Sequence, residues 1–318
     1  MHYDVFNGDA DGIIALVQLR LASPQDATLI TGVKRDIALL KQVDVSNAKS
    51  VTVLDISLEK NIGALNKLLT EKINIFYVDH HRAGDIPKSE CFTPIINTDA
   101  NTCTSLLVNE YLHGKYASWA VAAAFGDNMT QSAKQLATKI KLTDQQTSLL
   151  AELGVYINYN GYGRTVDDLH FHPAELFKKL VKSKEPLELI AEENSVFAEL
   201  KQAYHQDMEK AKHAKILFET EACKIVQLAD EAWARRVSGV FGNELANQSP
   251  KNAHAVLTLN ADQTFTVSVR APLHNKQGAD KICIQFSTGG GRAGAAGINQ
   301  LPQEQLAQFI EVMSNYYS

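Results

Sequence analysis

An apolar run at residues 73–78 stops abruptly at Asp79-His80-His81, and this junction limits the choice of fold more than any other feature. A β-rich run that ends in this way predicts a strand that carries metal-type ligands at its carboxyl end. Open α/β sheets place their functional sites at that edge. The junction therefore predicts a mainly parallel sheet with a candidate site beyond the ends of its strands.

Acidic residues follow three other strand-like runs in the same half of the chain. They are Asp9 and Asp11 after residues 3–6, Asp55 after residues 51–54, and Asp127 after the small-residue stretch 120–125. Carboxylates on separate strand ends can converge in space, and with imidazoles they form a site that suits hard or borderline divalent ions. Such a set predicts a two-metal site for phosphoryl chemistry.

In their order along the chain, these groups resemble the four motifs of the DHH phosphoesterase superfamily. Near the other end, residues 289–297 read Gly-Gly-Gly-Arg-Ala-Gly-Ala-Ala-Gly and resemble the GGGHxxAAG signature of that family. Single short motifs coincide by chance, but five separated motifs in the expected order are a specific signal. The resemblance covers nearly the whole chain and implies a Mn²⁺-dependent phosphoesterase, with Mg²⁺ as the alternative ion.

The resemblance also implies which residues hold two metal ions. The first ion would be held by Asp9 and Asp55, and the second by Asp11, Asp55, His80 and Asp127. Asp55 would then bridge the ions and hold them on the order of 3.5–4 Å apart, so that a shared water becomes hydroxide near neutral pH.

Two residues of the Asp-His-His triplet have roles beyond this set. Asp79 would be a further metal ligand or the acceptor that orients a histidine. His81 would contact the scissile phosphate or protonate the leaving oxygen. One position departs from the family pattern, because many members carry a histidine where this chain has Val5. The first ion would then bind more weakly, or take Asn7 or water as a ligand.

A second group of candidate residues lies near the carboxyl end of the chain. Arg270 ends a strand-like run, and an arginine there can grip a phosphate with two donors. Gly289, Gly290 and Gly291 allow a ligand to approach the backbone, and the start of a following helix would favour an anion. Arg292 stands where the family usually has histidine, so its fixed charge favours a phosphate and puts the family's base preference in doubt. These five residues are predicted to bind substrate.

The length of 318 residues favours two domains, each with its own core. Strand and helix signals alternate up to about residue 130, which predicts a doubly wound sheet. A charged helix is expected from Leu187 to about Lys215 as a linker, followed by a smaller α/β domain. The expected division is residues 1–185 for the DHH domain, 186–215 for the linker helix and 216–318 for the substrate-binding domain.

Three segments between the acids are open to more than one interpretation. The polar stretch 97–105 either caps a helix that runs to about Leu112 or lines the phosphate site. Residues 156–164 are expected to break a long helical region, as a loop that lines the cleft or as a solvated connection. Arg235 and Arg236 precede an expected turn at residues 238–240 and are read as a solvated pair.

Charge and composition limit the partners of the chain. The 31 basic and 36 acidic side chains give a net charge of −5, which argues against long duplex DNA as a partner. The sequence shows neither a leader nor an apolar run of spanning length, so a cytoplasmic protein without a membrane partner is expected. Four scattered cysteines predict reduced thiols rather than disulfides or a zinc site. The oligomeric state stays open, a homodimer included.

The predicted function is hydrolysis of phosphodiester bonds in short oligonucleotides or linear dinucleotides by two-metal-activated hydroxide. Within phosphoester chemistry, a nucleotide 3′-phosphatase and a cyclic-dinucleotide phosphodiesterase remain as alternatives. A nucleotide-sensing module with an impaired metal site is the rival from another class, suggested by Val5 and Arg292. The presence of every carboxylate of the set argues against this rival.

Overall fold

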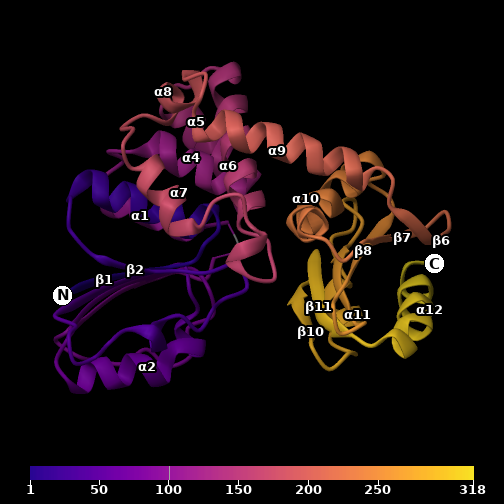
Figure 1. The fold of residues 1–318 in the computed structure, drawn as a ribbon, viewed down its shortest axis with the longest axis horizontal. Coiled ribbons are helices and arrows are strands. Elements are labelled where there is room, and N and C mark those ends of the chain that lie inside the picture. The colour runs from indigo at the N-terminus through magenta and orange to yellow at the C-terminus, as the bar shows by residue number, and fades with distance from the viewer. Residues whose placement is uncertain (100) are drawn as a thin grey trace. The chain divides into compact units, whose positions relative to one another are not determined.

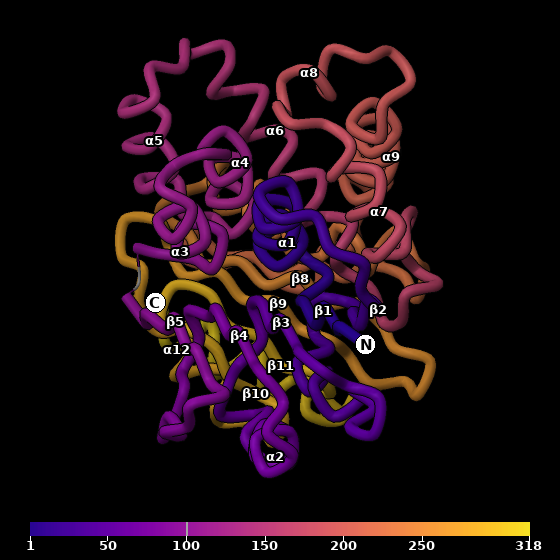
Figure 2. The backbone as a smooth tube through the Cα atoms, turned by 90° about the vertical axis from the view of Figure 1, so that its left-hand side faces the viewer, coloured from indigo at the N-terminus to yellow at the C-terminus, as the bar shows by residue number. Residues whose placement is uncertain are grey.

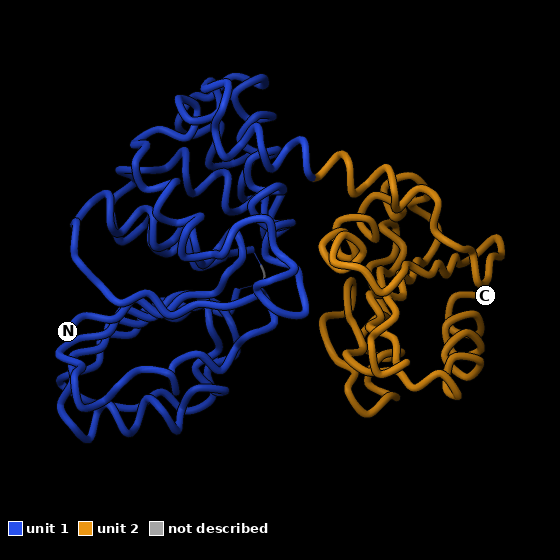
Figure 3. Tube along the Cα trace, viewed as in Figure 1, with its two compact units in different colours: residues 1–203 blue, residues 204–318 orange. Residues whose placement is uncertain are grey.

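The computed structural model describes residues 1–99 and 101–318, so Ala100 in the polar stretch lies outside the described residues. The chain divides into two compact units, Met1–Ala203 and Tyr204–Ser318 (Figure 3). Within the described ranges, none of the helices has both the length and the apolar character needed to cross a membrane.

The first unit is a five-stranded parallel sheet with helices on both faces. Its strands are β1 (His2–Phe6), β2 (Thr28–Ile30), β3 (Ser50–Leu54), β4 (Asn74–Asp79) and β5 (Phe92–Ile96), in the order β2-β1-β3-β4-β5. Helix α2 lies on one face, and α1, α3, α4 and α7 lie on the other (Figures 1 and 2). This order and these layers confirm the doubly wound α/β prediction for this unit.

The helices of the first unit follow from the pattern of their apolar residues. They are α1 (Ala10–Ala22), η1 (Leu40–Gln42), α2 (Leu58–Thr70), α3 (Thr104–Tyr111), α4 (Ala117–Gly126), α5 (Thr130–Lys139), α6 (Asp144–Asn160), η2 (Val166–Asp168), α7 (Pro173–Leu180) and α8 (Pro186–Ala191). Helix α9 (Val196–Ala211) begins in the first unit and ends in the second. In α2 the buried positions Leu58, Leu65 and Leu68 recur at helical spacing and pack on the sheet. By contrast, α1 is buried along nearly its whole length, since it touches β1 as well as α3, α4 and α7.

The second unit is built on a six-stranded mixed sheet. Its elements are β6 (Lys215–Glu219), β7 (Cys223–Leu228), α10 (Ala232–Gln248), β8 (Ala253–Leu259), β9 (Phe265–Arg270), α11 (Ala279–Cys283), β10 (Gly289–Arg292), β11 (Ala295–Leu301), η3 (Gln303–Gln305) and α12 (Leu306–Tyr317). The order is β10-β11-β9-β8-β7-β6, and among these described strands only the pairing of β7 with β8 is parallel. Helix α10 contacts β8 and β9, while α11 and α12 pack with the apolar core of the sheet.

Several local predictions are wrong. The helix expected from Leu187 to Lys215 is two helices, because Ser195 accepts a hydrogen bond from the N–H of Ala198 (3.3 Å) and begins α9 anew. Residues 120–125 belong to helix α4 rather than to a strand, as the helix propensity of alanine favours. Residues 156–160 complete helix α6, so the connection after it begins only at Gly161.

Two further corrections concern the second unit. Arg235 and Arg236 lie inside helix α10, not before a turn, and Arg236 is buried against Asp207. The glycine-rich segment forms strand β10 and pairs with β11, so no helix starts after it. Gly291 has φ 140°, and a Cβ there would lie 2.5 Å from the Cα of Ala296, which is why glycine suits this position.

Candidate metal centre

Three neighbouring parallel strands bring the predicted acids together at one edge of the first sheet. Asp9 follows β1, Asp55 follows β3, and Asp79 is the last residue of β4. Asp127 comes from the carboxyl end of α4 instead of from a strand. The structure thus brings the predicted acids of the first unit to one place.

Asp9 is the N-cap of α1, and both oxygens of its carboxylate accept hydrogen bonds from other groups of the protein. Its Oδ1 accepts hydrogen bonds from the N–H groups of Asp11 (3.0 Å) and Gly12 (3.1 Å). Its Oδ2 accepts from the ammonium of Lys34 at 2.6 Å. Burial opposes ionisation of Asp9, but the charge and hydrogen bond of Lys34 outweigh it and lower the pKa to about 2. Asp9 is therefore ionised and already paired.

Asp11 joins α1 to the start of α3. Its two carboxylate oxygens accept from the backbone N–H groups of Thr104 and Ser105, each at 2.7 Å. These donors belong to the first turn of α3, where backbone N–H groups have no partner in the helix and the helix dipole favours a negative charge. Each oxygen retains a lone pair that can face an ion.

Asp55 has an unfavourable backbone conformation, and its ionised form is disfavoured by its surroundings. Its φ of 59° lies in the left-handed region, which is uncommon for any residue with a side chain. Burial raises its pKa well above the ordinary value, and the negative charges of Asp11, Asp9 and Asp127 raise it further. The hydroxyl of Thr104 donates to its Oδ1 at 3.0 Å. Strain of this kind persists where the surroundings enforce it, and it clusters at functional sites.

His80 points one ring nitrogen at the acids. Its Nδ1 lies 3.0 Å from the carbonyl oxygen of Thr102, so Nδ1 donates and Nε2 carries the lone pair. Nε2 is 3.4 Å from Asp55, 3.8 Å from Asp11 and 3.8 Å from Asp127. A backbone carbonyl that fixes the tautomer is the usual support of a metal-binding histidine.

His81 is held differently and is more exposed. Its Nδ1 lies 2.7 Å from Oδ1 of Asp79, and 46% of its side chain is accessible, against 11% for His80. Burial alone would lower the pKa of His81, but the hydrogen bond and charge of Asp79 raise it. The two rings are tilted, with centroids 4.4 Å apart. Asp79 thus orients His81 and leaves its other nitrogen free to meet a ligand.

The donor set fits a divalent ion. Two groups have ligand atoms within 4.8 Å of one another, and these are Asp55 with His80 and His81, and Asp11 with His80 and Asp127. Buried carboxylate oxygens of Asp79 and Asp127 have no hydrogen-bond partner among the described residues, which is costly unless a cation or donor meets them. Burial raises the pKa of Asp127, Lys34 opposes this rise, and Asp11 and Asp9 add to it. Oxygen ligands with one or two imidazoles suit Mn²⁺ or Mg²⁺.

The predicted residues of the second unit lie in strands β9 and β10. Arg270 is held from α10 and β9, with its guanidinium donating to Asn243 (2.6 Å), Ser268 (2.9 Å) and the carbonyl of Gly239 (3.1 Å). Gly289, Gly290, Gly291 and Arg292 form β10, and Arg292 is exposed. The structure brings Arg270 and Arg292 into one sheet, two strands apart.

Strand register places four basic residues of the second unit in one row. Lys224 pairs with His254, His254 with Arg270, Arg270 with Ala295, and Ala295 with Arg292. Directly paired residues point to the same face of a sheet. Arg270 and Arg292 are therefore separated by about 10 Å of sheet width, two strand spacings. His254 lies opposite Arg270 in the hairpin of β8 and β9, but its side chain is buried.

Sequence analysis missed Lys34, Thr104 and Asn158 as members of the centre. The ammonium of Lys34 donates to Asn158 at 3.0 Å as well as to Asp9. Burial would lower the pKa of Lys34, but Asp9 and the other nearby negative groups raise it well above its ordinary value. Thr104 and Asn158 were noted only within the stretches 97–105 and 156–164, and no motif singled out Lys34.

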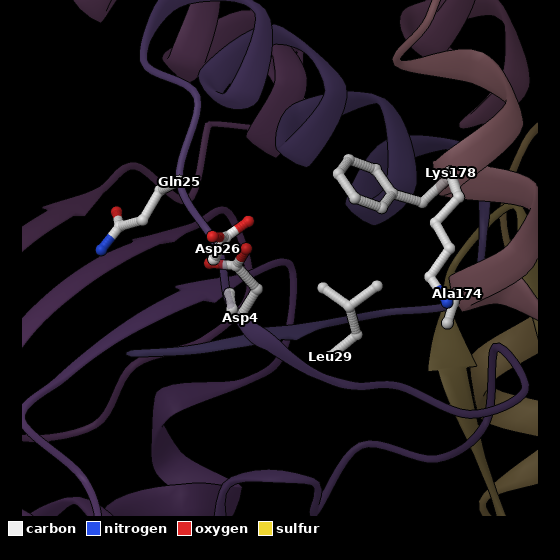
Figure 4. A pocket seen from close by; sticks show the side chains of 8 residues that line it. Asp4, Gln25, Asp26, Leu29, Ala174 and Lys178 are labelled. Carbon is white, nitrogen blue, oxygen red and sulfur yellow. The ribbon is translucent and has the colours of Figure 1, made fainter. Parts of the chain in front are cut away.

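A separate cavity of about 370 Å³ lies in the first unit, away from the predicted ligands (Figure 4). Its lining residues are Asp4, Gln25, Asp26, Ala27, Leu29, Ala174, Phe177 and Lys178. Asp4 is engaged by Arg20, whose Nε donates to it at 2.9 Å. The cavity shares no residue with the acidic centre.

Solved structures match this chain, although no family model and no curated protein does. A DHH-domain protein described as a member of a family of ribosomal proteins has 14% identity and a TM-score of 0.61, covering 99% of this chain and 86% of that one. Manganese-bound exonuclease RecJ has 14% identity and a TM-score of 0.57, covering 99% and 89%. The pGpG-specific phosphodiesterase PggH from Vibrio cholerae has 12% identity and a TM-score of 0.55, covering 99% and 100%.

Fold and centre together define a two-unit α/β protein with acids and imidazoles at the carboxyl edge of a parallel sheet. The matches over 99% of its length show that the chain has the DHH-superfamily fold, which confirms the fold implied by the order of its motifs.

Proposed function

We propose that this protein is a Mn²⁺-dependent phosphoesterase that hydrolyses phosphodiester bonds of short oligonucleotides or linear dinucleotides. The observation that carries the proposal is the geometry at His80, whose Nε2 faces three carboxylates at 3.4 to 3.8 Å. An ion bound by Asp11, Asp55, His80 and Asp127 would supply a Lewis acid and a bound water of lowered pKa. Two ions that share Asp55 are the count implied by the family resemblance.

The residues around the centre are suited to hydrolysis. In the reaction a water oxygen bonds to phosphorus while the bond from phosphorus to the leaving oxygen breaks. Asp79 orients His81, and 46% of the His81 side chain is accessible, which supports contact with the phosphate or proton donation to the leaving oxygen. Asp79 acts by holding the ring in that orientation.

The second unit supplies candidate substrate contacts. Arg270 and Arg292 lie in one row of the sheet, and β10 with Gly289, Gly290 and Gly291 exposes backbone beside them. Two guanidinium groups in one sheet favour a phosphorylated ligand. The fold neighbours include an exonuclease and a phosphodiesterase specific for pGpG, which supports nucleotide phosphodiesters as the substrate class. The net charge of −5 favours a short substrate over a long nucleic acid.

A substrate panel tests the proposal. The purified chain with Mn²⁺ would be assayed on linear dinucleotides, oligoribonucleotides of increasing length, nucleotide 3′-phosphates, cyclic dinucleotides and long single-stranded DNA. We expect the fastest turnover on the dinucleotides or the shortest oligomers, and loss of turnover in His81→Ala with metal binding retained. Preferred cleavage of 3′-phosphates or cyclic dinucleotides would move the assignment to those activities. Nucleotide binding without hydrolysis of any substrate would favour a sensing module instead.

A further inference from the structure

Lys34 places a positive charge inside the acidic centre. Its Nζ lies 2.6 Å from Oδ2 of Asp9, 3.0 Å from Oδ1 of Asn158 and 3.6 Å from Oδ1 of Asp127. The backbone around it is fixed, because its N–H donates to the carbonyl of Gly161 (2.8 Å) and its own carbonyl accepts from Asn7 (3.2 Å). The ammonium is thus held in the centre by both main chain and side chain.

The contacts of Lys34 use the oxygen of Asp9 that an ion would need. Oδ1 of Asp9 accepts two backbone N–H groups, and Oδ2 accepts the ammonium. Among the described residues, Asp9 belongs to neither group of ligand atoms that lie close enough together to hold an ion, and both groups contain His80. A divalent ion on Asp9 would lie next to the ammonium and be repelled by it.

The position of Val5 also offers the first ion no ligand. Many members of the family that this chain resembles carry a histidine where this chain has Val5, and Val5 is fully buried in the apolar core around β1. One ligand of the first ion is therefore replaced by a hydrocarbon, and another is bound to a lysine. The second set, Asp11, Asp55, His80 and Asp127, keeps all of its residues, and Nε2 of His80 lies 3.4 to 3.8 Å from one oxygen of each of the three acids.

We propose that the ammonium of Lys34 takes the place of one metal ion, so that the chain binds a single divalent ion through Asp11, Asp55, His80 and Asp127. Lys34 is a positioning residue: it neutralises Asp9 and holds a fixed positive charge beside the ion. This inference rests on the metal site of the proposed function, but it concerns the number of ions and does not depend on which substrate is cleaved.

Counting bound Mn²⁺ tests the inference without any activity assay. The full chain would be stripped with EDTA and titrated with Mn²⁺ in equilibrium dialysis, and electron paramagnetic resonance would distinguish an isolated ion from a coupled pair. We expect one ion per chain in the wild type, and two coupled ions in Lys34→Met. The double variant Lys34→Met/Asp9→Asn should return to one ion. Lys88→Met, an exposed lysine of the same unit, should match the wild type.

Two coupled ions in the wild type would overturn the inference, and so would a count of one in a folded Lys34→Met variant. Asp9→Asn covers the case in which Lys34→Met does not fold. With Lys34 present, that substitution should leave the count at one and the Mn²⁺ affinity within about threefold of wild type, because Asp9 is not a ligand. A loss of metal in Asp9→Asn would contradict the inference. Failure of the substrate panel together with one bound ion would reject the proposed activity and leave the ion count intact.

Discussion

Replacing Asp55 by asparagine is expected to stabilise the metal-free protein while removing the stabilisation that Mn²⁺ gives. Asparagine tolerates the left-handed backbone at this position, where φ is 59°. It also keeps an oxygen that can accept the hydroxyl of Thr104. The substitution therefore removes a negative charge from the centre and changes little else.

The size of the effect follows from the spacing of the acids. Nε2 of His80 is 3.4 Å from Oδ1 of Asp55 and 3.8 Å from Oδ2 of Asp11. Two such oxygens are at most about 7 Å apart and therefore repel by at least about 2 kcal/mol at an effective dielectric constant of about 20. Protonation relieves part of this repulsion in the wild type, so we expect Asp55→Asn to be about 1–2 kcal/mol more stable without metal at pH 8.

The difference in stability between Asp55→Asn and the wild type, both without metal, should increase as the pH rises. Burial and the neighbouring carboxylates raise the pKa of Asp55 well above 3.8 in the folded protein. As pH rises past about 4, the unfolded chain loses this proton before the folded one, so wild-type stability falls until the pH exceeds the folded pKa. Asparagine does not titrate. The advantage of the variant should therefore be small near pH 4 and grow toward pH 8.

Unfolding in EDTA and in Mn²⁺ would check this prediction. Wild type should gain about 2.7 kcal/mol when Mn²⁺ is at 100 times its dissociation constant, and the variant should gain much less. Asp85→Asn, an exposed acid of the same unit, controls for loss of charge alone. The reasoning is refuted if Asp55→Asn is the less stable protein in EDTA at pH 8, or if Mn²⁺ stabilises both proteins equally.

Three other predictions concern positions away from Asp55. Burial and Lys224 lower the pKa of His254 to about 4, so urea unfolding should show stability falling by about 3 kcal/mol as pH drops from 6.5 toward 4, and His254→Leu should lack this loss. Asp4→Ala should cost about 3–5 kcal/mol, measured by urea unfolding, because it leaves the buried guanidinium of Arg20 without its carboxylate partner, while Mn²⁺ binding persists. Arg292→Ala should raise KM about tenfold for small phosphorylated substrates and leave the number of bound Mn²⁺ ions unchanged. An unchanged KM would show that Arg292 is a surface charge that does not bind substrate.

The carboxyl edge of the first sheet was predictable because local sequence decides it. A β-rich run followed at once by an acid specifies both the strand and the position of the acid, as at Asp55 and Asp79. Because the strands are parallel, their carboxyl ends lie at the same edge of the sheet, and the acids that follow them come close together. Asp127 lies 3.8 Å from His80 beside the other acids, although the Ala-rich segment before it forms a helix and not the predicted strand.

The groups that tune the centre could not be predicted in this way. Lys34 comes from the connection after β2, and Asn158 comes from the end of α6, so the two meet only through tertiary packing. The hairpin of β10 and β11 was missed for a related reason. Glycine has low propensity for both helix and strand, so its pairing partner decides the structure.

The two acids of the Asp9-x-Asp11 motif show what spacing leaves undetermined. Both lie at the start of α1, and spacing alone gives no reason to rank one above the other as a metal ligand. Their partners differ: Asp9 gives one oxygen to two N–H groups and the other to an ammonium, whereas Asp11 accepts one N–H on each oxygen. A carboxylate oxygen has two lone pairs, so each oxygen of Asp11 keeps one, and the one left on Asp9 lies beside a cation. The motif locates the centre, but the helix start at Thr104 and the side chain of Lys34 decide how the oxygens of the two acids are engaged.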